Sequence, residues 1–146
     1  MVAKRTRKNY KRSVSVSHDH FPQSAKKDLV KTFLEMLNLI KLYHWHTYSY
    51  PEHKATDELY SSLNGHIDRF VEVLLGKEGG RINQVERVSY VIPDPQSTGE
   101  LKKKVEEFKD FLYKFPLSDP KDSDLANIRD EIVADLNQFL YLLTFH

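Results

Sequence analysis

The chain has 146 residues, of which 40% are hydrophobic and 12% aromatic, so it can bury one domain-sized core and is too apolar for a disordered protein. Its 22 lysines and arginines nearly balance 21 aspartates and glutamates, and the absence of cysteine excludes disulfides, thiolate metal sites and a cysteine nucleophile. No segment approaches the roughly 18 consecutive apolar residues that a membrane-spanning helix needs. The sequence therefore predicts a soluble, intracellular protein that does not bind membranes.

The first 23 residues are polar and basic and have no helical period, so we expect a flexible arm (1–23) before a folded domain (24–146). Six cationic residues and no acid occur before residue 13: Lys4, Arg5, Arg7, Lys8, Lys11 and Arg12. Such a cluster can bind nucleic acid through its phosphates, independently of base sequence, or act as a nuclear targeting signal. We assign His18 and His20 to the same disordered tract.

Apolar residues spaced three and four positions apart predict an amphipathic helix that begins after a cap at Ser24 and ends near Tyr48. A second helix is predicted to start at Pro51, a residue tolerated in a first turn, and to end at Gly76 or at Gly79. These two helices form the first half of the expected fold.

The segment 81–96 is expected to form a short helix or a packed loop. Ser97 with Glu100 is a capping-box signal for a third helix, and Asp122 or Ser123 caps a fourth. No strand pattern and no internal repeat are present in the sequence. The fold class expected from this pattern is all-α, a four-helix bundle with one longer connection in the middle.

Four polar side chains share one face of the second predicted helix, within an arc of roughly 100° at 100° per residue. They are His53, Asp57, Asp68 and Glu72. The apolar stripe beside them comprises Leu59, Leu63, Ile67, Phe70 and Leu74. Each polar pair is spaced by four residues, so its members can converge on one ion, and imidazole with carboxylates suits Fe(II), Mn(II) or Zn(II). A row of solvated surface charges is the alternative.

A histidine and the only tryptophan stand at the end of the first predicted helix, just before this row. Together the candidate residues are His44, Trp45, His53, Asp57, Asp68 and Glu72. Their types and spacing resemble the ferroxidase signature of the Dps proteins, the miniature ferritins that protect DNA during starvation. The resemblance covers about residues 33–80, and the chain also resembles, more loosely, an uncharacterised Dps-like group of large DNA viruses and phages. It implies a ferritin-like four-helix bundle.

The resemblance implies a ferroxidase, an enzyme that oxidises Fe(II) at a di-metal site on a two-fold subunit interface. One chain would supply His44, His53 and Asp57, its partner would supply Asp68 and Glu72, and manganese or zinc are alternatives to iron. Trp45 would lie beside the iron and count among the catalytic residues.

The same resemblance implies a homo-oligomer, at least a two-fold dimer and at most a dodecameric shell that stores iron. The basic arm would bind DNA. The location would be the cytoplasm or nucleoid, or the nucleus or virion for a viral protein. The interval between His44 and His53 is shorter than is usual in that family.

Other interpretations stay open. A non-catalytic Dps-like architectural protein would bind or compact nucleic acid through the arm, and a purely structural bundle would only dimerise. Ferritin-like enzymes with a site inside one bundle use Glu-x-x-His pairs, which the sequence lacks. A carboxylate site of that internal kind would use Glu35, Asp130, Glu131 and Asp135. His46 and His66 lie off the polar row and are expected on the surface.

Overall fold

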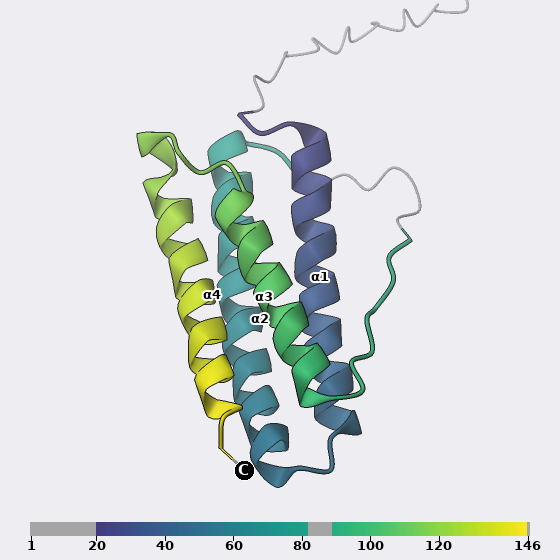
Figure 1. The fold of residues 1–146 in the computed structure, drawn as a ribbon. Coiled ribbons are helices and arrows are strands. Elements are labelled where there is room, and N and C mark those ends of the chain that lie inside the picture. Colours follow the sequence, from purple (N-terminus) through teal and green to yellow (C-terminus); the bar gives the residue numbers. More distant parts are fainter. Residues whose placement is uncertain (1–19, 82–88, 146) are drawn as a thin grey trace, which may run out of the picture.

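The computed structural model of the protein describes residues 20–81 and 89–145. In those ranges every regular element is helical, and the four long helices lie side by side in a bundle (Figure 1). The elements are α1 (Gln23–His46), α2 (Tyr50–Glu78), α3 (Thr98–Lys114), the 3-10 turn η1 (Pro120–Asp122) and α4 (Ser123–Leu142). The all-helical prediction with four helices is confirmed, whereas the basic residues of the arm lie outside the described ranges.

The connection between α2 and α3 returns the chain along the length of the bundle. The first turns of α2 and α3 lie together, because the Thr98 hydroxyl donates to Glu52 at 2.6 Å. The last turn of α2 lies at the start of α4, where Lys77 Nζ pairs with Asp124 Oδ1 at 2.8 Å. Helices α2 and α3 therefore run in the same direction, α1 and α4 run oppositely, and a single crossover joins the two halves.

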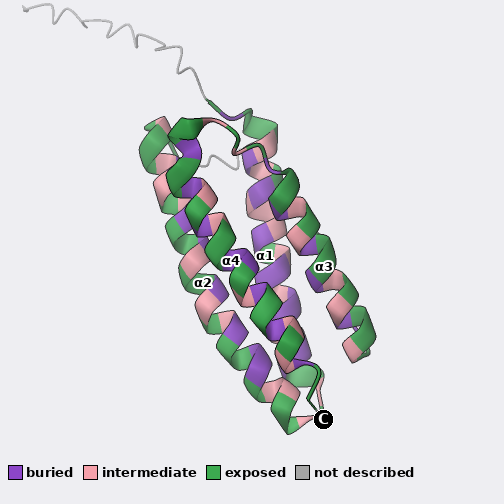
Figure 2. Ribbon diagram, turned by 60° about the vertical axis from the view of Figure 1, so that its left-hand side comes forward, coloured by how far each residue is buried: buried purple, intermediate pink, exposed green. Residues whose placement is uncertain are grey.

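The core lies between the four helices, along the stripes that the sequence predicted. Helix α2 packs against α1 and α4, and α3 packs against α4 and α1. Buried residues recur on the sides of the helices that face one another (Figure 2). The predicted stripe of α2 is buried in full: Leu59, Leu63, Ile67, Phe70 and Leu74. None of the helices within the described ranges is long and apolar enough to cross a membrane.

The first helix begins differently from the prediction. Ser24 is not its cap, because α1 starts at Gln23 after Pro22, whose φ of −55° suits a helix start. Phe21 is only 2% exposed and packs its ring against Phe115, with centroids 5.4 Å apart. The packed part of the chain therefore begins before the predicted boundary at residue 23.

The predicted start of the third helix is confirmed. The Ser97 hydroxyl accepts the backbone N–H of Glu100 at 3.2 Å. The returning bond of the capping box is displaced by one residue, since the Glu100 carboxylate accepts from the N–H of Gln96 at 2.8 Å. The part of the preceding connection that is described, residues 89–96, contains no helical turn.

A cluster of charged side chains closes the end of the bundle where α1 begins. Asp122 is fully buried, and its Oδ2 accepts a hydrogen bond from His20 Nε2 at 2.7 Å. Lys77 Nζ lies 3.6 Å from the other carboxylate oxygen of Asp122. Beside them, Lys26 and Glu78 form an ion pair whose side chains are both nearly buried. The assignment of His20 to a disordered tract is therefore wrong, while His18 lies outside the described residues.

We expect substitution of two glycines near the end of α2 to change the stability of the fold in opposite directions. Gly79 caps the helix with φ +67°, a left-handed conformation that an L side chain adopts at a cost, so we expect Gly79→Ala to lower the free energy of unfolding by about 1–2 kcal/mol. Gly76 lies inside the helix, and a Cβ there would meet no atom within 4 Å. Gly76→Ala should instead raise the free energy by about 0.8 kcal/mol. Urea denaturation of both variants measures the difference, and equal effects of the two substitutions would contradict the assigned cap.

Candidate functional site

The site forms around the tight connection between α1 and α2. Helix α1 ends at His46, α2 begins at Tyr50, and only residues 47–49 lie between them. The Ser49 hydroxyl accepts the N–H of Glu52 at 3.4 Å, and Pro51 occupies the first turn, so the sequence starts α2 as soon as the chain reverses. The short connection places the last turn of α1 directly against the first turn of α2.

His44 and His53 bind each other's backbone. The Nδ1 of His44 donates to the carbonyl oxygen of His53 at 3.0 Å, and the Nδ1 of His53 donates to the carbonyl oxygen of His44 at 3.0 Å. A carbonyl oxygen only accepts, so Nδ1 carries the proton in both rings and the Nε2 of each neutral ring keeps its lone pair. Hydrogen bonds of this kind orient the histidine ligands of metal sites. Both imidazoles are therefore prepared to donate a lone pair to a cation.

The two rings stack with their centroids 3.9 Å apart and an interplanar angle of 22°. His44 is 9% exposed, and its Nδ1 also lies 3.3 Å from the hydroxyl of the fully buried Thr56. Asp57 reaches the other side of that ring, with its Oδ1 4.0 Å from His44 Nε2. Two of the predicted ligands, His44 and His53, are thus in contact, and a third, Asp57, lies beside His44.

Lys41 faces the same carboxylate. Its Nζ lies 3.9 Å from Asp57 Oδ1 and 4.5 Å from the centroid of the Tyr60 ring. The carboxylate of Asp57 therefore stands between an imidazole and an ammonium group, and a positive charge already lies beside the site.

Glu52 joins the connection to two helices. Its carboxylate accepts hydrogen bonds from the hydroxyls of Tyr43 at 2.9 Å, Thr47 at 2.7 Å and Thr98 at 2.6 Å. Burial opposes its ionisation, but the bonds from Thr98, Thr47 and Tyr43, together with the charge of Lys102, outweigh burial and lower the pKa of Glu52. Burial raises the pKa of the Tyr43 hydroxyl, which keeps that group a hydrogen-bond donor. The ionised Glu52 therefore fixes the backbone that carries both histidines.

Asp68 and Glu72 lie apart from this cluster. Both are exposed on α2, and Asp68 follows Asp57 by eleven residues, about 16 Å along a helix. Asp68 borders an apolar groove of about 270 Å³ between α1 and α2. The other residues of the groove are Val30, Phe33, Leu34, Leu37, Asn64, Ile67 and Val71. Within residues 20–81 and 89–145 of one chain, no three histidine or acidic side chains converge on a point that could hold a metal ion.

A profile described as a family of unknown function, DUF5856, matches residues 44–143. The chain belongs to the DUF5856 family. The matched region contains all six candidate residues and begins at the first of them, His44, whereas the basic cluster of the arm lies outside it. No curated protein and no solved structure matches the chain.

Trp45 and His46, the two residues that follow His44, are exposed. Trp45 is 70% exposed at the end of α1, so its indole lies mostly in solvent in the single chain. His46 is exposed as predicted, and its ring stacks loosely on Tyr43, with centroids 6.1 Å apart.

His66 is partly exposed at the surface, with its side chain 31% accessible, but it has partners on another helix that the sequence did not predict. Its Nδ1 donates to Asp135 Oδ2 at 2.7 Å, and its Nε2 lies 3.9 Å from Glu131 Oε2, so it links α2 to α4. The partners of His66 lie on another helix, more than sixty residues further along the chain, so the spacing of residues within α2 does not predict this pairing.

The internal carboxylate site considered from the sequence is not assembled in this DUF5856 chain. Each of its four acids has a basic neighbour of its own within 4 Å. The pairs are Glu35 with Lys31, Asp130 with Arg129, Glu131 with Arg69, and Asp135 with His66.

Proposed function

We propose that this DUF5856 protein is a Dps-like ferroxidase with a ferritin-like bundle, which oxidises Fe(II) at a di-metal site shared between two subunits. The observation that carries the proposal is the reciprocal bonding of His44 and His53, which leaves the Nε2 atom of each ring free of the backbone, with Asp57 Oδ1 4.0 Å from the Nε2 of His44. The single crossover between α2 and α3 supports it as well, because ferritin-like bundles have one such connection.

The spacing of the rings favours two metal ions over one. The two rings lie in separate, nearly parallel planes, with centroids 3.9 Å apart and an interplanar angle of 22°. An ion in the plane of one ring therefore does not lie in the plane of the other, which suits one ion per ring and not a single shared ion. Asp57 can contact an ion held at His44.

A second subunit would complete the ligand set. Asp68 and Glu72 cannot reach His44 in the same chain, but an antiparallel pairing of two α2 helices, with a two-fold axis near residues 62–64, would bring the acids of one chain to the histidines of the other. The groove beside Asp68 supplies apolar surface for such a pairing, and Leu34 on its rim is 42% exposed.

The reaction needs little from the protein beyond binding and orientation. Two Fe(II) ions give one electron each to one hydrogen peroxide, which takes up two protons and leaves as two water molecules. Carboxylates stabilise the Fe(III) product, and imidazoles retain affinity for Fe(II). Dioxygen is the alternative oxidant.

Two further activities accompany this proposal. The six cations at residues 4–12 carry no acid between them, which favours sequence-independent binding of DNA. Storage of the oxidised iron would require a closed shell, up to a dodecamer, built from the dimer.

Stopped-flow measurement of Fe(II) oxidation, with peroxide and with air, tests the proposal. We expect His44→Ala to slow the reaction at least about 100-fold, because it removes one of the two lone pairs. His46→Ala is the matched control, since His46 is exposed two residues away and should leave the rate unchanged. Wild-type and His44→Ala proteins that react at equal rates, with circular dichroism showing both folded, would overturn the proposal.

The dimer can be tested separately from the chemistry. We expect Leu34→Glu to weaken self-association by at least about 30-fold, because it places a charge on the apolar surface beside the groove. Tyr113→Glu is the control, as Tyr113 is 57% exposed on α3, away from that face. Sedimentation equilibrium gives both constants, and an unchanged constant for Leu34→Glu would exclude the α1–α2 face as the interface.

A further inference from the structure

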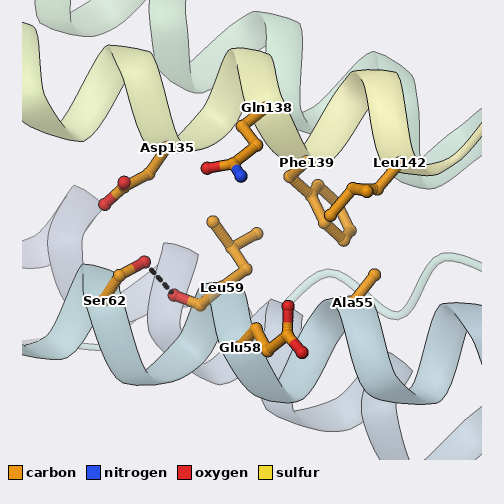
Figure 3. A pocket seen from close by; sticks show the side chains of 8 residues that line it. All are labelled: Ala55, Glu58, Leu59, Ser62, Asp135, Gln138, Phe139 and Leu142. Carbon is orange, nitrogen blue, oxygen red and sulfur yellow. Dashed lines mark hydrogen bonds between the residues drawn. The ribbon is translucent and has the colours of Figure 1, made fainter.

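A second concave site lies between α2 and α4, and the residues of the proposed metal site do not line it. It has a volume of about 190 Å³, the size of one or two long side chains (Figure 3). Its lining comprises Ala55, Glu58, Leu59 and Ser62 from α2, and Asp135, Gln138, Phe139 and Leu142 from α4.

The lining is apolar in the middle and acidic at its edges. Leu59 and Phe139 point into the space between the two helices, and Glu58 and Gln138 approach it from opposite sides (Figure 3). Asp135 holds His66 through Oδ2, and Glu58 has no ion pair or hydrogen bond from its side chain within the described residues. No lysine or arginine lines the pocket. Its chemistry therefore suits an ammonium or guanidinium group on an aliphatic stem.

Exposed aromatic rings surround the same end of the bundle. Tyr141 and Phe145, 62% and 53% exposed, form an edge-to-face pair with centroids 5.1 Å apart, on either side of the last lining residue of α4 in the sequence. The α1–α2 connection lies at this end as well (Figure 1), and Tyr48 in the connection and Tyr50 at the start of α2 are 106% and 72% exposed. The faces of such rings attract cations, most strongly when the cation is partly desolvated.

We propose that this pocket and the aromatic rings at its end bind the lysine and arginine side chains of the chain's own N-terminal segment, residues 4–12. The segment carries six cations and no acid, which complements the unpaired carboxylate and the aromatic faces. The proposal concerns neither iron nor the two-fold interface, so it stands independently of the ferroxidase.

The length of the chain permits this docking within one subunit. Helix α1 starts at the opposite end of the bundle and its 24 residues span about 36 Å. Residues 12 and 4 precede His20 by 8 and 16 residues, so they can lie up to about 27 and 53 Å from it when the chain is extended. The segment of the same subunit can therefore reach the pocket, and so can that of a neighbouring subunit.

NMR spectra of the full-length protein test the docking. The reporters are the side-chain amide of Gln138 and the methyl groups of Leu59 and Leu142. The variant has all six cations of the segment replaced by glutamine. We expect the reporter shifts of wild type and variant to differ, and a synthetic peptide of residues 1–12 added to the variant should restore the wild-type shifts. Salt should weaken this binding, because the contacts are largely charged.

Single substitutions locate the binding. Glu58→Gln, made in the glutamine-substituted protein, should weaken peptide binding at least about fivefold, since it removes the unpaired carboxylate. Asp110→Asn is the matched control, because Asp110 is exposed on α3 and does not line the pocket. Identical reporter shifts in wild type and variant, or equal peptide affinities with and without Glu58, would overturn the proposal. A response to putrescine without one to the peptide would overturn it too, by assigning the pocket to a free polyamine.

Discussion

If the proposed ferroxidase site is shared between subunits, mixed dimers that contain one His44→Ala subunit and one Asp68→Ala subunit should recover about half of the wild-type rate of Fe(II) oxidation, and each variant alone should be inactive. In such a dimer one site loses both its histidine and its acid, whereas the other receives His44 from one chain and Asp68 from its partner and is intact. The physical reason is distance. His44 lies beside His53 at the start of α2, whereas Asp68 lies several turns further along that helix, so His44 and Asp68 cannot meet within one chain.

Two affinity tags, one on each variant, allow the mixed dimer to be isolated after refolding of a mixture. Each parent variant, refolded alone, is the control for activity lost in handling. An inactive mixed dimer, obtained from well-folded subunits, would show that the site does not combine these residues across an interface.

Glu52→Ala should lower the free energy of unfolding by about 3 kcal/mol. The substitution removes the acceptor of three hydroxyl groups, which belong to α1, to the connection at residues 47–49 and to α3. It leaves the buried Tyr43 with only the Thr98 hydroxyl, 3.4 Å away, as a partner. Asp110→Ala is the control, because Asp110 is an exposed acid on α3 and its loss should change stability by less than about 0.5 kcal/mol. Urea denaturation at pH 7 compares the two, and equal losses would show that Glu52 does not hold the connection.

The stabilisation from Glu52 should depend on pH in one direction. Its pKa is lower in the folded protein than the ordinary value of 4.5, so folding favours the carboxylate. The contribution is then complete above about pH 4.5 and declines as the pH falls through the lowered pKa of the folded state. The difference in stability between wild type and Glu52→Ala should therefore shrink below pH 4.5, and a difference that grew there would reverse the assigned shift.

Much of the fold could be predicted because the information is local. The spacing of apolar residues defined the stripe of α2, and the pair Ser97 and Glu100 marked the start of α3. The start of α1 could not be predicted in this way. Phe21 packs on Phe115, more than ninety residues away. Pro22 occupies the cap position without a side-chain hydrogen bond, and the helix begins at Gln23.

The candidate site was also predictable only where its contacts are local in the sequence. Spacing alone suggested His53 and Asp57, one turn apart, and the family resemblance added His44, which the structure places beside both the His53 ring and the Asp57 carboxylate. Glu52 was missed because its three hydrogen-bond donors come from three different segments, and an acid at the start of a helix indicates only interaction with the helix dipole. The pairing of His66 was missed for the same reason, as its partners belong to α4.

The bonding of His44 and His53 has a consequence for how this region can vary. Each ring is held by the backbone of the other residue, so both bonds depend on the register between the end of α1 and the start of α2. A residue added to the stretch 47–49 that shifted this register would break both bonds, even with every side chain retained. The two hydrogen bonds therefore depend on the length of the α1–α2 connection. A homologue or a designed variant can keep both histidines and still lose both bonds through a single inserted residue.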